Sequence, residues 1–137
     1  MPKSSSKKPN SPVQHLFEYA VIRVVPRVER EEFINVGVIL YCSGLKYLNA
    51  LHRLDVEKLR ALCSHTDPDE LERYLQALTA ICAGKTEGGP IGQLPLASRF
   101  RWLTATRSSV VQTSRVHPGF CTDASETLLR LFGQLVL

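Results

Sequence analysis

Between residues 88 and 122 the chain contains no Asp, Glu or Lys, although it contains four arginines. These are Arg99, Arg101, Arg107 and Arg115. Elsewhere the charges nearly balance: residues 13–87 hold nine basic and eleven acidic side chains, and the net charge of all 137 residues is +4. Because the guanidinium group suits planar, bidentate contact with carboxylate or phosphate, the segment indicates an anionic ligand or an acidic partner without identifying it.

Long apolar runs are also lacking. No stretch approaches the roughly 20 residues that a membrane-spanning helix needs, and the start of the chain has charge but no apolar signal-peptide core. Residues 1–12 hold three Pro, four Ser and three Lys, which predicts a disordered basic tail, with an arm that touches nucleic acid as the alternative. We expect residues 13–137 to form a single α+β domain of a cytoplasmic protein.

Motifs for catalysis and metal binding are absent from the sequence. No glycine-rich phosphate loop or serine nucleophile elbow occurs, and no motif surrounds any of the four histidines. The four cysteines form no C-x-x-C pair and are expected to be reduced, buried thiols. A zinc site built from His52, Cys63, His65 and Cys82 would need an unusual C-x-H spacing. We therefore predict no metal and no cofactor, and the sequence favours a binding protein over an enzyme.

Apolar, β-branched runs predict three strands near the start, over residues 16–25, 33–42 and 45–51. Ser43–Gly44 marks a tight turn between the second and third strands. Together they predict an antiparallel meander.

Helices are predicted to follow. A short apolar pattern begins at Val56, and a longer helix runs from an N-cap at Asp67 to a stop at Gly84. Another helix begins at an N-cap at Asp123, whereas residues 99–103 fit either a strand or a helix.

A fourth strand is predicted over residues 108–114, with a turn at His117-Pro118-Gly119 as its exit. The predicted order β-β-β-α-α-β-α describes a small antiparallel sheet with helices packed on one face.

Arg23 lies among apolar residues of the first predicted strand. An unpaired buried charge costs several kcal/mol, so Arg23 either pairs with Glu31 or Glu32 or serves a binding site. In the second strand, alternation places Phe33, Asn35 and Gly37 on one face. Asn35 then either binds a ligand or satisfies a loop, and Gly37 marks a bulge or a close approach, for example of a helix.

The arginine-rich segment has two interpretations. If residues 99–103 are extended, Arg99 and Arg101 share a face. Arg107 with the hydroxyls of Ser108 and Ser109 resembles an anion cradle. Trp102 beside arginines is also suited to stacking on a base. Alternatively, the arginines form a solvent-exposed face that Phe100 and Trp102 anchor in the core.

Two blocks of the chain carry a family resemblance. The first is Tyr19-x-x-x-Arg23-x-x-Pro26 followed by Glu32-Phe33-x-Asn35-Val36-Gly37-Val38, and the second is Arg99-Phe100-Arg101-Trp102-Leu103 followed by Arg107-Ser108-x-x-x-Gln112. They resemble a bacterial family catalogued as domain of unknown function 3037. The resemblance implies short cytoplasmic proteins without an assigned activity, often encoded beside a toxin-like serine/threonine kinase. It further implies that one surface contains Arg23, Asn35, Arg101, Arg107, Ser108 and Gln112.

The sequence thus predicts a small cytoplasmic interaction module with a protein partner, accessory to a neighbouring kinase-like or nucleotide-handling enzyme. The alternative is a binder of a phosphorylated ligand or nucleic acid through residues 99–115. Because the folded part carries little net charge, we expect nucleic-acid binding to be weak. No membrane partner is expected.

Overall fold

The computed structural model describes residues 13–25, 32–62, 65–105 and 110–137. The predicted tail, residues 1–12, lies outside these ranges. A five-stranded antiparallel sheet runs through the molecule in the order β4-β3-β2-β5, and β6 also pairs with β2. The strands are β2 (His15–Val24), β3 (Ile34–Cys42), β4 (Tyr47–His52), β5 (Val111–Thr113) and β6 (His117–Cys121). The first three confirm the predicted meander, and Lys46 N donates to Ser43 O at 3.1 Å in the predicted turn.

Local capping groups set several of the helix ends. The helices are α1 (Val56–Leu62), α2 (Pro68–Ala83), α3 (Leu96–Ala105) and α4 (Ala124–Leu135), with short 3₁₀ turns η2 (Thr86–Gly88) and η3 (Ile91–Gln93). Asp67 caps α2 by accepting from Asp69 N, and Asp123 caps α4 by accepting from Glu126 N. Gly84 ends α2 at φ 73°, a left-handed conformation that glycine adopts without a steric penalty.

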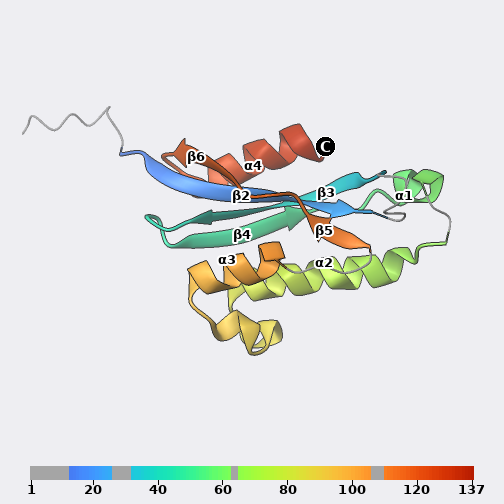
Figure 1. Cartoon of the computed structure of the whole chain (residues 1–137), viewed down its shortest axis with the longest axis horizontal. Coiled ribbons are helices and arrows are strands. Elements are labelled where there is room, and N and C mark those ends of the chain that lie inside the picture. The colour runs from blue at the N-terminus through green and yellow to red at the C-terminus, as the bar shows by residue number, and fades with distance from the viewer. Residues whose placement is uncertain (1–12, 26–31, 63–64, 106–109) are drawn as a thin grey trace, which may run out of the picture.

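Helices cover both faces of the sheet (Figure 1). On one face, α2 and α3 pack on a core that includes Ile22 and Ile39. On the other, α4 packs on a second core that includes Val38 and Leu40. The α+β class and the antiparallel sheet are confirmed, but the expected placement of all helices on one face is wrong. Both faces need a cover because β3 is apolar on both sides at these positions.

Strand β6 was predicted as a turn. Pro118 and Gly119 suggest a turn, yet Pro118 stands opposite Glu18 and Gly119 opposite Phe17 in a regular antiparallel pair. β6 lies at an edge, where a proline can be tolerated because its missing N–H need not face a partner strand. A Cβ at Gly119 would lie 2.5 Å from the Phe17 ring, so glycine makes room for that ring.

A β-bulge changes the faces predicted for β3. The register moves from Ile22 opposite Gly37 to Arg23 opposite Asn35, so Val36 is an extra residue. Val36 packs in the core under α2 and α3, while Asn35 bonds α4 on the other face. Gly37 therefore does not share a face with Asn35, and its close neighbours are the backbone of β4 and Ile22 rather than a helix.

Residues 99–103 are helical, as part of α3. The extended alternative, which placed Arg99 beside Arg101 on one face, is therefore wrong. The predicted strand over 108–114 is present as the shorter β5, and residues 108 and 109 lie outside the described ranges. No helix in those ranges is long and apolar enough to cross a bilayer.

Candidate functional site

Three of the six predicted site residues lie side by side in the sheet. Arg23 in β2 stands opposite Asn35 in β3 and opposite Gln112 in β5. Residues directly opposite in antiparallel strands project to the same face. The three therefore form a polar row across the sheet, on the face that α4 covers in part.

The other three predicted residues are not brought into this row by the described structure. Arg101 is exposed on α3, which packs against the opposite face of the sheet. Arg107 and Ser108 lie outside the described residues.

Arg23 lies over an aromatic ring. Its Cζ atom is 4.3 Å from the centroid of the Phe33 ring, a cation–π arrangement. Glu31, one of the two expected partners of Arg23, lies outside the described residues. The Nε of Arg23 is buried and has no hydrogen-bond partner in the described part of the chain. The guanidinium group is thus held in place by the ring while retaining an unused donor.

Asn35 ties the start of β3 to the end of α4. Its Nδ2 donates to Leu135 O at 3.0 Å, one of the last carbonyls of α4, which have no partner within the helix. This bond fixes the orientation of the amide and leaves Oδ1 buried without a partner among the described residues. Asn35 thus satisfies a helix end rather than a loop, and its Oδ1 remains available.

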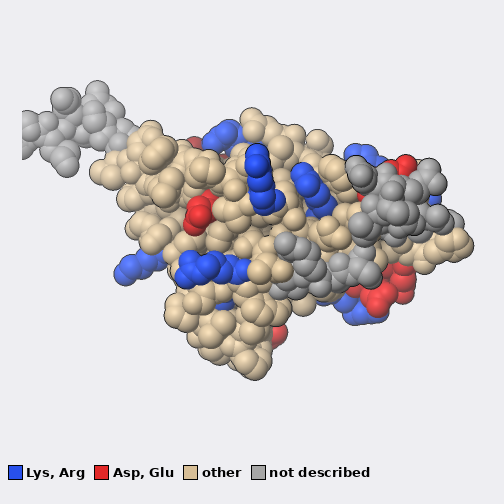
Figure 2. Space-filling view, viewed as in Figure 1, with Lys and Arg blue, Asp and Glu red and all other residues tan. Residues whose placement is uncertain are grey.

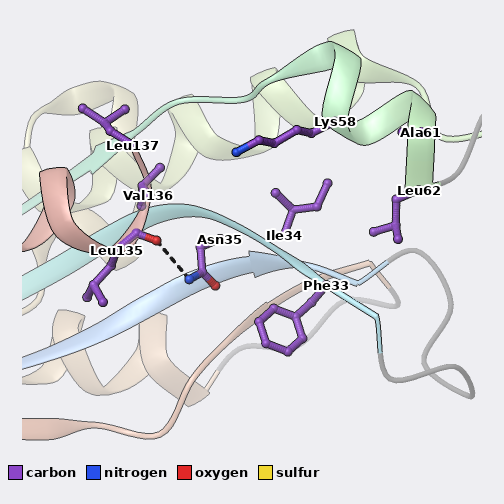
Figure 3. Close-up of a pocket in the computed structure, with 9 residues that line it drawn as sticks. All are labelled: Phe33, Ile34, Asn35, Lys58, Ala61, Leu62, Leu135, Val136 and Leu137. Atoms are coloured by element: carbon purple, nitrogen blue, oxygen red, sulfur yellow. Dashed lines mark hydrogen bonds between the residues drawn. The ribbon is translucent and has the colours of Figure 1, made fainter.

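A hollow of about 560 Å³ opens beside Asn35. It is lined by Phe33, Ile34, Asn35, Lys58, Ala61, Leu62, Leu135, Val136 and Leu137. These residues come from the start of β3, from α1 and from the end of α4 (Figure 3). Lys58 extends across the hollow toward Val136 and Leu137, with Ile34 between the two sides.

A smaller hollow of about 130 Å³ adjoins it and shares Ile34, Asn35 and Lys58 with it. Arg53 and Asp55 also line this extension. The Oδ1 of Asp55 accepts the N–H groups of Glu57 and Lys58 at the start of α1. Two cations, Arg53 and Lys58, and one carboxylate, Asp55, therefore lie at one side of the opening.

The arginine-rich segment does not form one surface in the described structure. Arg99 donates from Nε to Leu94 O at 2.8 Å and from Nη1 to Ile81 O and Cys82 O at 3.1 and 2.9 Å. It therefore completes the end of α2, a structural role. Arg101 is exposed on α3, and Arg115 is exposed in the segment between β5 and β6. Figure 2 shows the Lys and Arg side chains of this face as separate points with other surface between them.

Metal ligands are not gathered in the described residues, where no group of three or more His, Cys, Asp or Glu is arranged to hold an ion. Cys63, part of the zinc alternative, lies outside those residues, and His52 Nδ1 is 3.8 Å from Glu72 Oε2. Cys42, Cys82 and Cys121 are free and buried, as expected.

Sequence reasoning missed the α1 and α4 walls of the hollow. Lys58, Ala61 and Val136 carry no motif, and only the packing of their helices brings them to Asn35. Phe33 was placed on the face of Asn35, but its contact with Arg23 depends on a register that local sequence does not reveal.

The model of one protein family, described as Protein of unknown function (DUF3037), matches residues 19–136. The chain belongs to this family. The match begins in β2 and ends just after α4, so it includes Arg23, Asn35, Gln112 and every wall of the hollow except Leu137. Comparisons with curated proteins and with solved structures give no match.

Proposed function

We propose that this DUF3037 protein is a small binding module that holds a segment of a partner protein in the hollow beside Asn35. The observation that carries the proposal is the chemistry of the wall: apolar side chains from three elements, with Lys58 and Asn35 as the polar exceptions. The volume of about 560 Å³ lies within the range of roughly 300–1,000 Å³ that is usual for ligand sites. A mainly apolar wall with few polar groups is suited to recognition of a peptide segment.

The end of the sheet beside the hollow supports the same proposal. Phe33 is 49% exposed although it carries the stacked Arg23. An exposed aromatic ring with an arginine on it is typical of the residues that dominate protein interfaces. The hollow and this pair together offer one continuous binding region at the start of β3.

A bulky substitution in the hollow tests the proposal. Ala61 is exposed and lines the hollow, so Ala61→Arg should fill it without disturbing the core. Ala77 is exposed on α2 and does not line the hollow, so Ala77→Arg is the matched control. We expect a partner captured by the wild type and by Ala77→Arg to be lost with Ala61→Arg.

The captured partner is then purified and titrated calorimetrically against the three proteins. Retention of the measured affinity by Ala61→Arg, with its melting temperature unchanged, would show that the hollow is not the site.

A phosphorylated ligand or nucleic acid is the second candidate. This candidate is supported by Arg23, which stands opposite Gln112 and has a guanidinium N–H without a hydrogen-bond partner among the described residues. The exposed Arg101 and Arg115 add positive charge elsewhere on the surface. Titration with inorganic phosphate and with a single-stranded oligonucleotide, read by shifts of the Arg23 Nε–Hε resonance, separates the candidates. A shift that saturates at physiological salt would favour the anion candidate.

We also propose a cytoplasmic location and an accessory role beside a kinase-like or nucleotide-handling enzyme. The three free, buried thiols fit a reducing compartment, and the partner class follows from the family resemblance alone. Co-purification with the product of a neighbouring gene, tested with Ala61→Arg and Ala77→Arg, examines the accessory role.

A further inference from the structure

The edge of the sheet is left open at the start of β3. β3 pairs with β4 from Cys42 to Gly37, where His52 is the last partner. Arg53 N then donates to Val36 O at 2.7 Å, and the chain turns away into α1. On its other side β3 remains paired with β2 as far as Ile34. One side of β3 therefore loses its neighbour before the strand ends.

The peptide groups of Asn35 point to that open side. Val21 O accepts from Ser114 N and Val25 N donates to Val110 O, so the odd-numbered residues here direct their peptide groups away from β3. Neighbouring residues of a strand direct them to opposite sides. The peptide groups of Val24 therefore point toward Ile34, its partner in β3. Those of Ile34 point back toward β2, and those of the following residue, Asn35, point away from β2 to the open side.

The open side is the floor of the hollow, because Ile34 and Asn35 line both the hollow and its extension. Among the described residues, no hydrogen bond from α1 or from the segment after β4 reaches the Asn35 backbone. An exposed donor and acceptor at a strand edge form a template for another strand. Here the template lies between apolar walls, with Lys58, Arg53 and Asp55 on the side of α1. The Asp55 Oδ1 already accepts two N–H groups of α1, and the two cations outnumber this carboxylate.

We propose that the occupant of the hollow is an extended, acidic segment of a partner protein that adds to β3 as a strand, in line with β4. This deepens the proposed function and rests on it. The segment exchanges peptide hydrogen bonds with Asn35 and directs alternate apolar side chains at the walls. An acidic side chain pairs with Lys58, which gives the site its preference for charge. Strand addition is a common mode of peptide recognition because the backbone supplies affinity and alternate side chains supply specificity.

The test uses the full chain and a displayed library of random octapeptides, from which the enriched sequence is synthesised. Each peptide bond of that peptide is then N-methylated in turn. We expect one position, the residue that stands opposite Asn35, to weaken binding at least about 10-fold and the two positions next to it to have little effect, since only that residue's N–H bonds Asn35 O and its neighbours direct theirs away. Exchange of the Asn35 amide proton should slow on binding.

Charge preference is tested with Lys58→Gln, which should weaken binding of an acidic peptide roughly 3- to 5-fold. Arg60→Gln is the matched control, because Arg60 is exposed on the same helix and does not line the hollow. Equal effects of the two variants would overturn the assignment to Lys58.

Two outcomes overturn strand addition while leaving the proposed function standing. One is a peptide that is blocked by Ala61→Arg yet binds equally well when each of its peptide bonds is N-methylated in turn. The other is self-association of the chain, measured by sedimentation and abolished by Ala61→Arg, which would make a second copy the occupant. Failure of the library to yield any peptide that protects the Asn35 amide also rejects strand addition, and insensitivity of partner binding to Ala61→Arg rejects the proposed function itself.

Discussion

Arg99 should contribute far more stability than Arg101, although the two arginines are only two residues apart on α3. The Arg99 guanidinium donates to three carbonyls, two at the end of α2 and one before α3. Ile81 and Cys82, which supply two of them, are 9% and 3% exposed. Water therefore cannot fully replace the guanidinium group when it is removed.

The magnitude follows from these contacts. A hydrogen bond to a charged group contributes about 1.5–3 kcal/mol, and an unsatisfied buried acceptor costs about 1–3 kcal/mol. Because Arg99 is itself only half-buried, partial rehydration reduces the sum. We expect Arg99→Ala to lower the free energy of unfolding by about 2–3 kcal/mol, and Arg101→Ala, on an exposed side chain, to change it by less than about 0.5 kcal/mol.

The assay is urea denaturation of both variants beside the wild type, with slopes compared to confirm a common unfolding transition. Arg99→Lys adds a further control: a single ammonium cannot bond both Leu94 O and the end of α2, so it should recover only part of the loss. Equal stabilities of Arg99→Ala and Arg101→Ala would refute the assignment of a structural role to Arg99.

Two further predictions concern backbone space and pH. Gly37→Ala would place a Cβ 2.7 Å from Leu51 O, so we expect it to lower the free energy of unfolding by about 1–3 kcal/mol. Gly133→Ala, in α4 with no atom within 4 Å, should raise it by about 0.5–1 kcal/mol; thermal melts that move in the same direction would contradict this pair. Burial raises the pKa of the Cys82 thiol from 9.0 to about 12, so the unfolded chain loses this proton first. The stability that Cys82 contributes is complete below pH 9 and is lost as pH rises toward 12. This one group should remove about 1 kcal/mol between pH 9 and 10, and Cys82→Ala should show a shallower decline over that interval in denaturation curves. Equal slopes for Cys82→Ala and the wild type would contradict it.

Features governed by nearby residues could be predicted from the sequence. Asp67, Gly84 and Asp123 act on peptide groups within a few positions of themselves, so their capping roles follow from local chemistry. The meander could also be predicted locally, because a short turn at Ser43 brings β3 and β4 side by side as an antiparallel pair.

The errors arose where a distant residue decides the local conformation. Pro118 and Gly119 are typical of a turn, but pairing with Glu18 and Phe17 of β2 makes them part of an edge strand. The bulge at Val36 moves every earlier residue of β3 to the other face, and nothing in the local pattern marks it. Whether α4 covers the second face depends on how the two cores divide the apolar residues, which is a property of the whole chain.

The candidate site divides in the same way. The sequence alone singled out Arg23 and Asn35 as chemically unusual within apolar strands, since a polar group there needs a partner or a purpose. Gln112 was named only through the family resemblance. Only the tertiary structure made these three residues neighbours, because pairing across β3, β2 and β5 brings together residues almost ninety positions apart. The tertiary structure also placed Arg99 at the end of α2, away from these three residues, and placed Asn35 against α4 and the hollow. Hydrogen-bond partners and cavity walls depend on distance in space, which sequence separation does not encode.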